Sequence, residues 1–94
     1  MRPVPKTKRV TSLKNINAVS RLPCSVCYAP NVDVHHFKSK GSGGGDELEN
    51  LVSLCRRHHN EFHNLGVETW TKKYKTQVDL FRALYKMPPL NYST

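Results

Sequence analysis

The sequence predicts a small α+β domain organised around bound metal, and three observations lead to that prediction. Every cysteine and histidine of the 94-residue chain lies between positions 24 and 63. Within this stretch, residues 32–37 and 51–54 have strand character and can pair as a hairpin. A helix is expected over residues 56–64, with Gly66 just past its end as a left-handed cap. A chain this short buries little apolar surface, and bound metal often supplies the missing stability.

Composition limits the class of protein. Fifteen Lys and Arg against seven Asp and Glu give a net charge of +8, which favours a polyanionic partner, nucleic acid above all. A basic surface that only maintains solubility explains the charge equally well. Three cysteines, two of them as C-x-x-C, argue against a disulfide framework. No apolar run reaches the roughly 18 residues of a membrane span, and no signal peptide is visible. We therefore expect a cytoplasmic protein without a membrane partner.

The chain divides into a basic flexible arm, residues 1–11, and a single domain, residues 12–94. The arm can lie along phosphates, or it can be a tail without a role. Ser12 is expected to cap a short helix that ends before Pro23 and has an apolar face for packing, made of Leu13, Ile16 and Val19. The glycine-rich run over residues 38–46 predicts a loop, either a plain connector or a flexible element near a DNA backbone.

Two helices are expected over residues 67–87. The first has Val67, Trp70 and Tyr74 on one face, and this spacing is typical of core packing rather than of base stacking. The second should begin at the capping-box pattern of residues 76–79. Its inward side chains are expected to be Val78, Phe81, Leu84 and Tyr85.

Two matched spacings predict a structural zinc site. Cys24-x2-Cys27 and Cys55-x2-His58 have the two-knuckle spacing of zinc-binding domains. Four such ligands close a tetrahedral shell and leave no position for water. The alternative, three buried cysteines and a surface histidine, does not account for two equal spacings.

A second, open metal site is expected on the same helix. At about 100° per residue, Cys55 and His58 lie within roughly 60° of each other and His59 and His63 within roughly 40°, and the two pairs are centred about 90° apart. One helix can therefore serve two ions on adjacent flanks. With His35 from the first strand, the second pair leaves positions open for water and a phosphate oxygen. Taken alone, His59 and His63 are equally consistent with ordinary surface histidines.

Together with His36 beside His35 and Asn50 before the second strand, these residues resemble the motif of the HNH endonucleases. The resemblance covers residues 24–66 and rests on a His-His pair in the first strand, an asparagine before the second strand and histidines on the helix. It implies a ββα-metal core with a zinc knuckle and flanking helices. Flanking sequences on both sides are most similar to small phage-encoded members of the family. The residues that carry the motif are His35, His36, Asn50, His59 and His63.

The resemblance also implies roles. His35, His59 and His63 would hold a catalytic divalent cation, Mg2+ or Mn2+ in a cell, with Ni2+ or Zn2+ as alternatives. His36 would be the general base in DNA hydrolysis, leaving 5′-phosphate and 3′-hydroxyl ends. Asn50 is expected to bond across the loop and fix the backbone that carries His36. The family usually has cysteine at the position of His58. Histidine is also a good zinc ligand, so the substitution changes the coordination shell but keeps the site.

Several alternatives stay open at this stage. Four basic residues can contact phosphates or can simply be solvated, namely Lys38, Lys40, Arg56 and Arg57. A zinc-stabilised nucleic-acid-binding module without cleavage activity is the alternative function, although it has no use for the second set of histidines. With little room for a recognition domain, we expect weak specificity or a recruiting protein, such as a recombinase or another phage factor. Adjacent strand residues point to opposite faces, so a strand end or a bulge is expected at His35 and His36.

Overall fold

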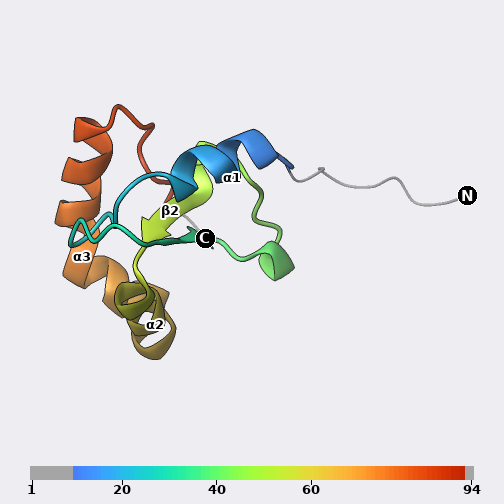
Figure 1. Cartoon of the computed structure of the whole chain (residues 1–94). Helices are drawn as coiled ribbons and strands as arrows, with labels where there is room; N and C mark the ends of the chain where they lie inside the picture. Colours follow the sequence, from blue (N-terminus) through green and yellow to red (C-terminus); the bar gives the residue numbers. More distant parts are fainter. Residues whose placement is uncertain (1–9, 93–94) are drawn as a thin grey trace, which may run out of the picture.

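The computed structural model describes residues 10–92 as an α+β fold built on a two-stranded antiparallel sheet. Its elements, in order, are α1 (Leu13–Ser20), β1 (Asp33–His36), the 3-10 turns η1 (Lys40–Ser42) and η2 (Leu48–Asn50), β2 (Leu51–Leu54), α2 (Arg56–Leu65) and α3 (Val67–Leu84). Both strands contact α1 and α2, and α2 in turn contacts α3 (Figure 1). No helix within residues 10–92 has the length and apolar character needed to cross a membrane.

The two faces of the sheet bury different partners. All four residues of β2 are buried, and alternate residues of a strand point to opposite faces. Val52 and Leu54 belong to the main core, with Phe62 of α2 and Trp70 of α3. On the other face, the Ser53 hydroxyl donates to the carbonyl of Pro23 at 2.7 Å. The core thus lies between the sheet and the helix pair α2–α3, and Trp70 is a core residue as predicted.

The strand register decides where the two adjacent histidines point. His35 pairs with Val52 and His36 with Leu51, in an unbroken antiparallel ladder. His35 therefore shares the core face with Val52, while His36 lies on the opposite face. The strand ends at His36 and contains no bulge. A strand end or a bulge was expected at His35 and His36, and the structure has the strand end.

The N-terminal helix matches its prediction except at one residue. The Ser12 side chain accepts a hydrogen bond from the backbone N–H of Asn15 and caps α1. Val19 is buried, but Leu13 is 71% exposed, so the expected three-residue apolar face is wrong at its first position. Residues 1–9 of the predicted arm lie outside the described part of the chain. Val10, assigned to the arm, instead accepts a hydrogen bond from the Asp46 backbone.

The C-terminal region differs most from prediction. Instead of two helices meeting at residues 76–79, one helix, α3, runs from Val67 to Leu84. No glycine or proline interrupts it, so the local capping pattern is overridden by continuation of the helix. Leu84 and Tyr85 were expected inside but are exposed, at 67% and 38%. The glycine-rich loop, expected to lack helix, contains the short turn η1.

Gly66 alone separates α2 from α3. Its φ is +88°, as expected for a glycine cap, but its ψ of 161° lies outside the left-handed helical region that was predicted. The backbone N–H of Gly66 donates to the carbonyl of Phe62. The helices therefore meet at a sharp corner that brings Trp70 onto Phe62.

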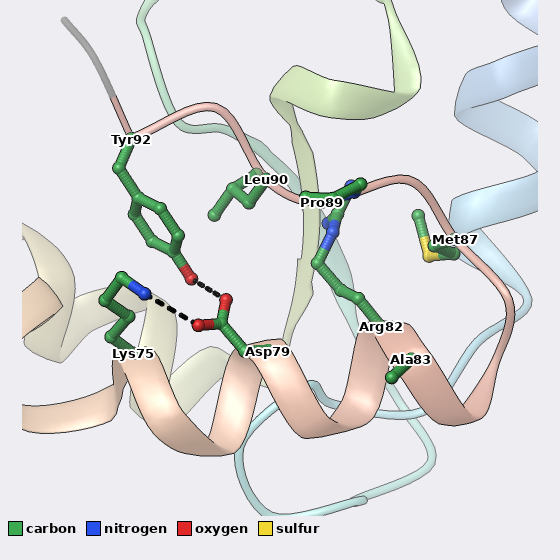
Figure 2. A pocket seen from close by; sticks show the side chains of 8 residues that line it. All are labelled: Lys75, Asp79, Arg82, Ala83, Met87, Pro89, Leu90 and Tyr92. Carbon is green, nitrogen blue, oxygen red and sulfur yellow. Dashed lines mark hydrogen bonds and ion pairs between the residues drawn. The ribbon is translucent and has the colours of Figure 1, made fainter.

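A buried arginine ties α3 to the segment around Asn50. The Arg82 guanidinium donates to the carbonyls of Leu48, Leu51 and Pro88 at 2.6–2.8 Å. Beside it, Asp79 accepts hydrogen bonds from Tyr92 and Lys75, as Figure 2 shows. Because Arg82 is only 2% exposed, these carbonyls take the place of water around its charge. The C-terminal segment is thereby fixed against the start of β2.

Candidate metal centres

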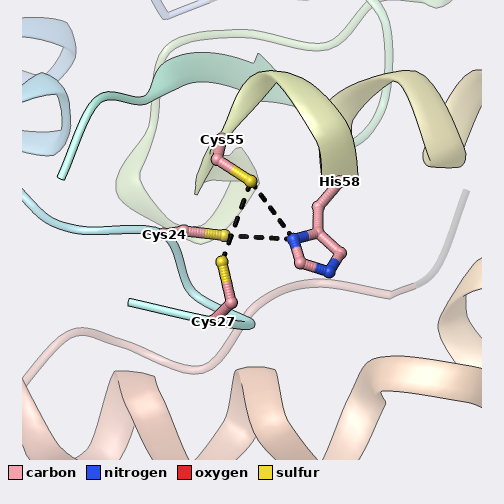
Figure 3. Close-up of side chains that lie close together, drawn as sticks. All are labelled: Cys24, Cys27, Cys55 and His58. Atoms are coloured by element: carbon pink, nitrogen blue, oxygen red, sulfur yellow. Dashed lines mark hydrogen bonds between the residues drawn. The ribbon is translucent and has the colours of Figure 1, made fainter. Parts of the chain in front are cut away.

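The structure brings the four predicted zinc ligands together in what we call the cysteine–histidine cluster. A tight turn holds Cys24 and Cys27, with the Tyr28 N–H donating to the Cys24 carbonyl, and Cys55 and His58 lie at the start of α2. Sγ of Cys27 lies 3.8 Å from Sγ of Cys55, and Nδ1 of His58 lies 3.2 Å from the Cys55 sulfur (Figure 3). A tetrahedral shell with Zn–S bonds of about 2.3 Å requires sulfur separations of about 3.8 Å.

The surroundings of the cysteine–histidine cluster favour a thiolate at Cys55, whereas burial raises the pKa of the Cys27 thiol. Burial raises the pKa of the Cys55 thiol, but the N–H groups of His58 and Arg57 and the neighbouring thiols outweigh it, and its pKa is lowered. Cys55 is the N-cap of α2, where the helix dipole also favours negative charge. The N–H of Val26 points at the Cys24 sulfur, 3.4 Å away. The cluster could therefore hold a metal ion such as zinc, with all four ligands supplied by the protein.

A second cluster, the three-histidine cluster, lies on the adjacent flank of α2. One ring nitrogen from each of His35, His59 and His63 can be chosen so that all lie within 4.8 Å of one another. Nε2 of His59 and Nε2 of His63 are 3.2 Å apart, close to the separation of two nitrogens bound to one ion. His35 is buried, His59 is half-buried and His63 is exposed, so this cluster opens to solvent.

Two features of the three-histidine cluster fit a cation. Nε2 of His35 is buried and has no hydrogen-bond partner among the described residues, and such orphaned nitrogens are rare without a ligand. Burial, with smaller contributions from His59 and His63, lowers the pKa of His35 to about 4. His35 is therefore a neutral imidazole at neutral pH, which is the form that binds metals.

Asp33 supports the three-histidine cluster from outside. Its Oδ2 lies 2.9 Å from Nδ1 of His59, the ring nitrogen that faces away from His63. Arg56 donates to both oxygens of the same carboxylate, at 2.9 and 3.2 Å. Arg56 and then His59 lower the pKa of Asp33 to about 2. A carboxylate on the far nitrogen is the usual support for a metal-binding histidine.

His36 does not join the three-histidine cluster. On the opposite face of the sheet, its Nε2 lies 2.7 Å from Oδ1 of Asp46. Asp46 is 4% exposed, and its pKa is lowered chiefly by His36 and then by the N–H of Ser12. His36 is 17% exposed through its side chain, so solvent still reaches the ring.

Asn50 makes the hydrogen bonds across the loop that the sequence led us to expect. Its Oδ1 accepts from the N–H of Lys38, and its Nδ2 donates to the carbonyls of Lys38 and Gly45. The N–H of Phe37 donates to the Asn50 carbonyl. A side chain on Gly44 would come within 1.8 Å of the Lys38 carbonyl oxygen, so only glycine allows this closure. Asn50 thus fixes the chain directly after His36.

The four predicted phosphate contacts lie in different surroundings. Arg56 is engaged by Asp33, while Arg57 is exposed and lines an open hollow with Glu61 and Lys73. Lys38 is half-buried and Lys40 exposed, both on the loop that follows His36. The structure does not gather the four basic residues into one patch.

Sequence reasoning missed two carboxylates, Asp33 and Asp46. Asp33 lies two residues before His35 and so on the same strand face, and the period of two was a signal that could have placed it beside the three-histidine cluster. For Asp46, ten residues from His36 across a glycine-rich loop, the sequence carries no comparable signal.

The chain matches one protein family and is similar to one protein of Escherichia coli. Residues 1–88 match the family described as "Protein of unknown function (DUF968)". The protein named "Uncharacterized protein YdfU" of Escherichia coli (strain K12) is 38% identical over 80 residues, which is 82% of this chain and 23% of YdfU. The chain thus spans about a quarter of the length of that relative. No solved structure matches it.

Proposed function

This chain belongs to the DUF968 family, and we propose that it is a metal-dependent endonuclease of the HNH type that hydrolyses DNA phosphodiester bonds. In this proposal the hairpin β1–β2 and the helix α2 are a ββα-metal core. The cysteine–histidine cluster is its structural zinc site, and the three-histidine cluster holds the catalytic ion. Cys55 and His58 at the start of α2 belong to the first cluster, and His59 and His63 belong to the second, as expected from their angular positions around the helix.

The observation that carries the proposal is the convergence of His35 of β1 with His59 and His63 of α2. The partnerless nitrogen of His35 and the carboxylate of Asp33 behind His59 both favour a divalent cation there. Three protein ligands leave further positions for water and phosphate. When bound, Mg2+ or Mn2+, or alternatively Ni2+ or Zn2+, would polarise the phosphate and stabilise the departing oxygen.

His36 is the proposed general base. A neutral imidazole accepts a proton from water while the water oxygen bonds to phosphorus and the bond to the 3′ oxygen breaks. Because His36 and His35 lie on opposite faces of β1, the base and the ion would act on the phosphate from different sides. Asn50 would support this step by fixing the backbone after His36.

DNA is the proposed substrate because of the charge of the chain. The net charge of +8 favours a polyanion. Arg57 on α2, and Lys38 and Lys40 on the loop after His36, are candidates for phosphate contacts. Arg56 is engaged by Asp33. Because the candidate contacts within residues 10–92 are divided between α2 and the loop after His36, we propose that a recruiting protein, such as a recombinase or another phage factor, directs the enzyme to its site.

A plasmid-nicking assay tests the proposal. Supercoiled DNA is incubated with wild type, His36→Ala and the control Gln77→Ala, which alters an exposed residue of α3, in separate reactions with Mg2+, Mn2+, Ni2+ or Zn2+. We expect nicking by wild type and control, and a loss of about 100-fold or more for His36→Ala. Equal nicking by all three would remove His36 from the mechanism. If none of them nicks DNA but all bind it, the chain is the zinc-stabilised binding module instead.

A further inference from the structure

Asp46 carries a set of contacts that neither the predicted motif nor the proposed metal sites account for. Its Oδ1 faces Nε2 of His36 at 2.7 Å, and its Oδ2 accepts from the N–H of Ser12 at 2.9 Å. Its backbone is held as well, because its N–H donates to the Val10 carbonyl and its C=O accepts from Nδ2 of Asn15. Because both the side chain and the backbone of Asp46 are held, its carboxylate can hold the His36 ring in one orientation.

The conformation of the loop before Asp46 places this residue beside His36. Asn50 donates to the carbonyl of Gly45, the residue directly before Asp46. A side chain on Gly45 would come within 2.8 and 2.9 Å of the backbone N and O of Val10, so the close approach of the two segments requires glycine. One chain of contacts thus runs from Asn50 through Gly45 and Asp46 to the His36 ring.

From this geometry we propose that Asp46 is a positioning residue, which holds His36 as the tautomer protonated on Nε2 and leaves Nδ1 as the nitrogen that accepts a proton. An ionised carboxylate only accepts hydrogen bonds, so the ring nitrogen facing it at 2.7 Å must carry hydrogen. In the neutral ring the other nitrogen is then the acceptor.

The consequence for the reaction rests on the proposed nuclease function. The proton of the attacking water moves to Nδ1, while the water oxygen bonds to phosphorus and the 3′ oxygen departs. The imidazolium formed keeps its Nε2–H on Asp46, whose negative charge stabilises it, as a carboxylate does behind a catalytic histidine. The inference also gives α1 a role in the site, because the N–H of its N-cap Ser12 donates to the Asp46 carboxylate and Nδ2 of Asn15 donates to the Asp46 backbone carbonyl.

The test is Asp46→Asn, compared with Asp79→Asn, which makes the same change at a side chain that contacts Lys75 and Tyr92. In Asp46→Asn the amide NH2 can donate to Nε2 while its oxygen still accepts from Ser12. The ring is then free to switch to the tautomer protonated on Nδ1. Nitrogen NMR of 15N-histidine-labelled, zinc-loaded protein, at alkaline pH where imidazole is neutral, reports the tautomer directly. Resonances are assigned with His→Gln variants.

We expect Nε2 of His36 to be protonated in wild type and in Asp79→Asn, and unprotonated in Asp46→Asn. In the nicking assay, Asp46→Asn should lose about 100-fold in rate at saturating DNA with little change in KM, and Asp79→Asn should match wild type. A wild-type ring protonated on Nδ1 overturns the inference, even if Asp46→Asn fails to fold. An unchanged nicking rate in Asp46→Asn overturns it too. If wild type does not nick DNA, the nuclease proposal fails, while the spectrum still decides the role of Asp46.

Discussion

The cysteine–histidine cluster and the three-histidine cluster share α2 but differ in their donor atoms and in the number of ligands that the protein supplies. In the first, a turn and the start of the helix supply all four ligands, and its cysteine thiols are the soft donors that zinc prefers. In the second, only imidazoles converge, and their exposure increases from His35 through His59 to His63. The first arrangement closes a coordination shell, and the second leaves one side of it open.

The difference shows how one short helix can separate architecture from chemistry. Cys55 and His58 precede His59 and His63 by a rotation that places the pairs on neighbouring flanks. The first flank faces the turn at residues 24–27, and the second faces His35 of β1. Binding at the first should therefore govern folding, and binding at the second should govern reactivity. The predictions below test that separation, beginning with the largest effect.

Loss of the zinc site should unfold the domain. Binding of structural zinc contributes about 10 kcal/mol or more in small domains, and here it would join residues 24–27 to α2. Cys55→Ser, or treatment of wild type with a strong chelator, should abolish the cooperative thermal transition seen by circular dichroism. Metal analysis of the folded wild type should give one tightly held zinc per chain. An unchanged melting temperature without zinc would contradict the structural role of the cysteine–histidine cluster.

The matched change at the three-histidine cluster should have the opposite outcome. We expect the double variant His59→Ala/His63→Ala to keep its zinc and its cooperative transition, because neither side chain is fully buried. It should lose calorimetric binding of Mn2+ or Ni2+ and all nicking. A double variant that unfolds, or that still binds the added ion, would show that the two clusters are not separate in the way proposed.

The sequence predicted this division better than it predicted the surroundings. Cysteine and histidine spacing is local, so helical geometry separates the four ligands at α2 into two pairs, and the C-x-x-C spacing assigns Cys24 and Cys27 to the first of them. The position of Asp33 follows from the period of two along β1, but the role of Asp46 depends on a loop that closes across ten residues, which no local pattern encodes. The same limit explains the error at residues 76–79, where a local capping pattern lies inside a continuous helix. Leu13 and Leu84 have helical spacing, but no neighbouring element within the described chain covers them.

His35 of the three-histidine cluster should make the folding stability of the domain sensitive to acid. The pKa of His35 is about 4 in the folded chain, against about 6.5 for a free imidazole. Below pH 6.5 the unfolded state therefore binds a proton that the folded state does not, so stability falls as the pH drops from about 6.5 to about 4. The full loss is roughly 3 kcal/mol.

Urea unfolding of zinc-loaded wild type and His35→Leu at several pH values measures this contribution. Zinc content is measured at each pH, and only pH values at which both proteins keep their zinc are compared, so the difference between their slopes isolates His35. We expect the variant to be less sensitive to acid between about pH 6.5 and 4. Parallel pH profiles would mean that His35 is protonated in the folded protein, and would weaken its assignment as a metal ligand.

The smallest expected effect is at Asp33. It tests whether the Asp33 carboxylate strengthens metal binding by the three-histidine cluster. Asp33→Asn keeps an oxygen that can accept from Nδ1 of His59 but removes the negative charge behind the ligand. Loss of such a partner typically weakens metal binding by about 10- to 100-fold. Because an acceptor remains, we expect about 10-fold for Mn2+ or Ni2+ by calorimetry, with zinc content and melting temperature nearly unchanged.

Arg56→Gln provides the opposite arm of this test. Arg56 competes with His59 for the same carboxylate, at 2.9 Å from Oδ2. Its removal should leave more of the negative charge to His59, so metal binding should stay the same or become tighter. If Asp33 acted only as the surface partner of Arg56, both substitutions would leave the affinity for the added ion unchanged. Weaker binding in Asp33→Asn alone is the result that would identify the carboxylate as part of the metal centre.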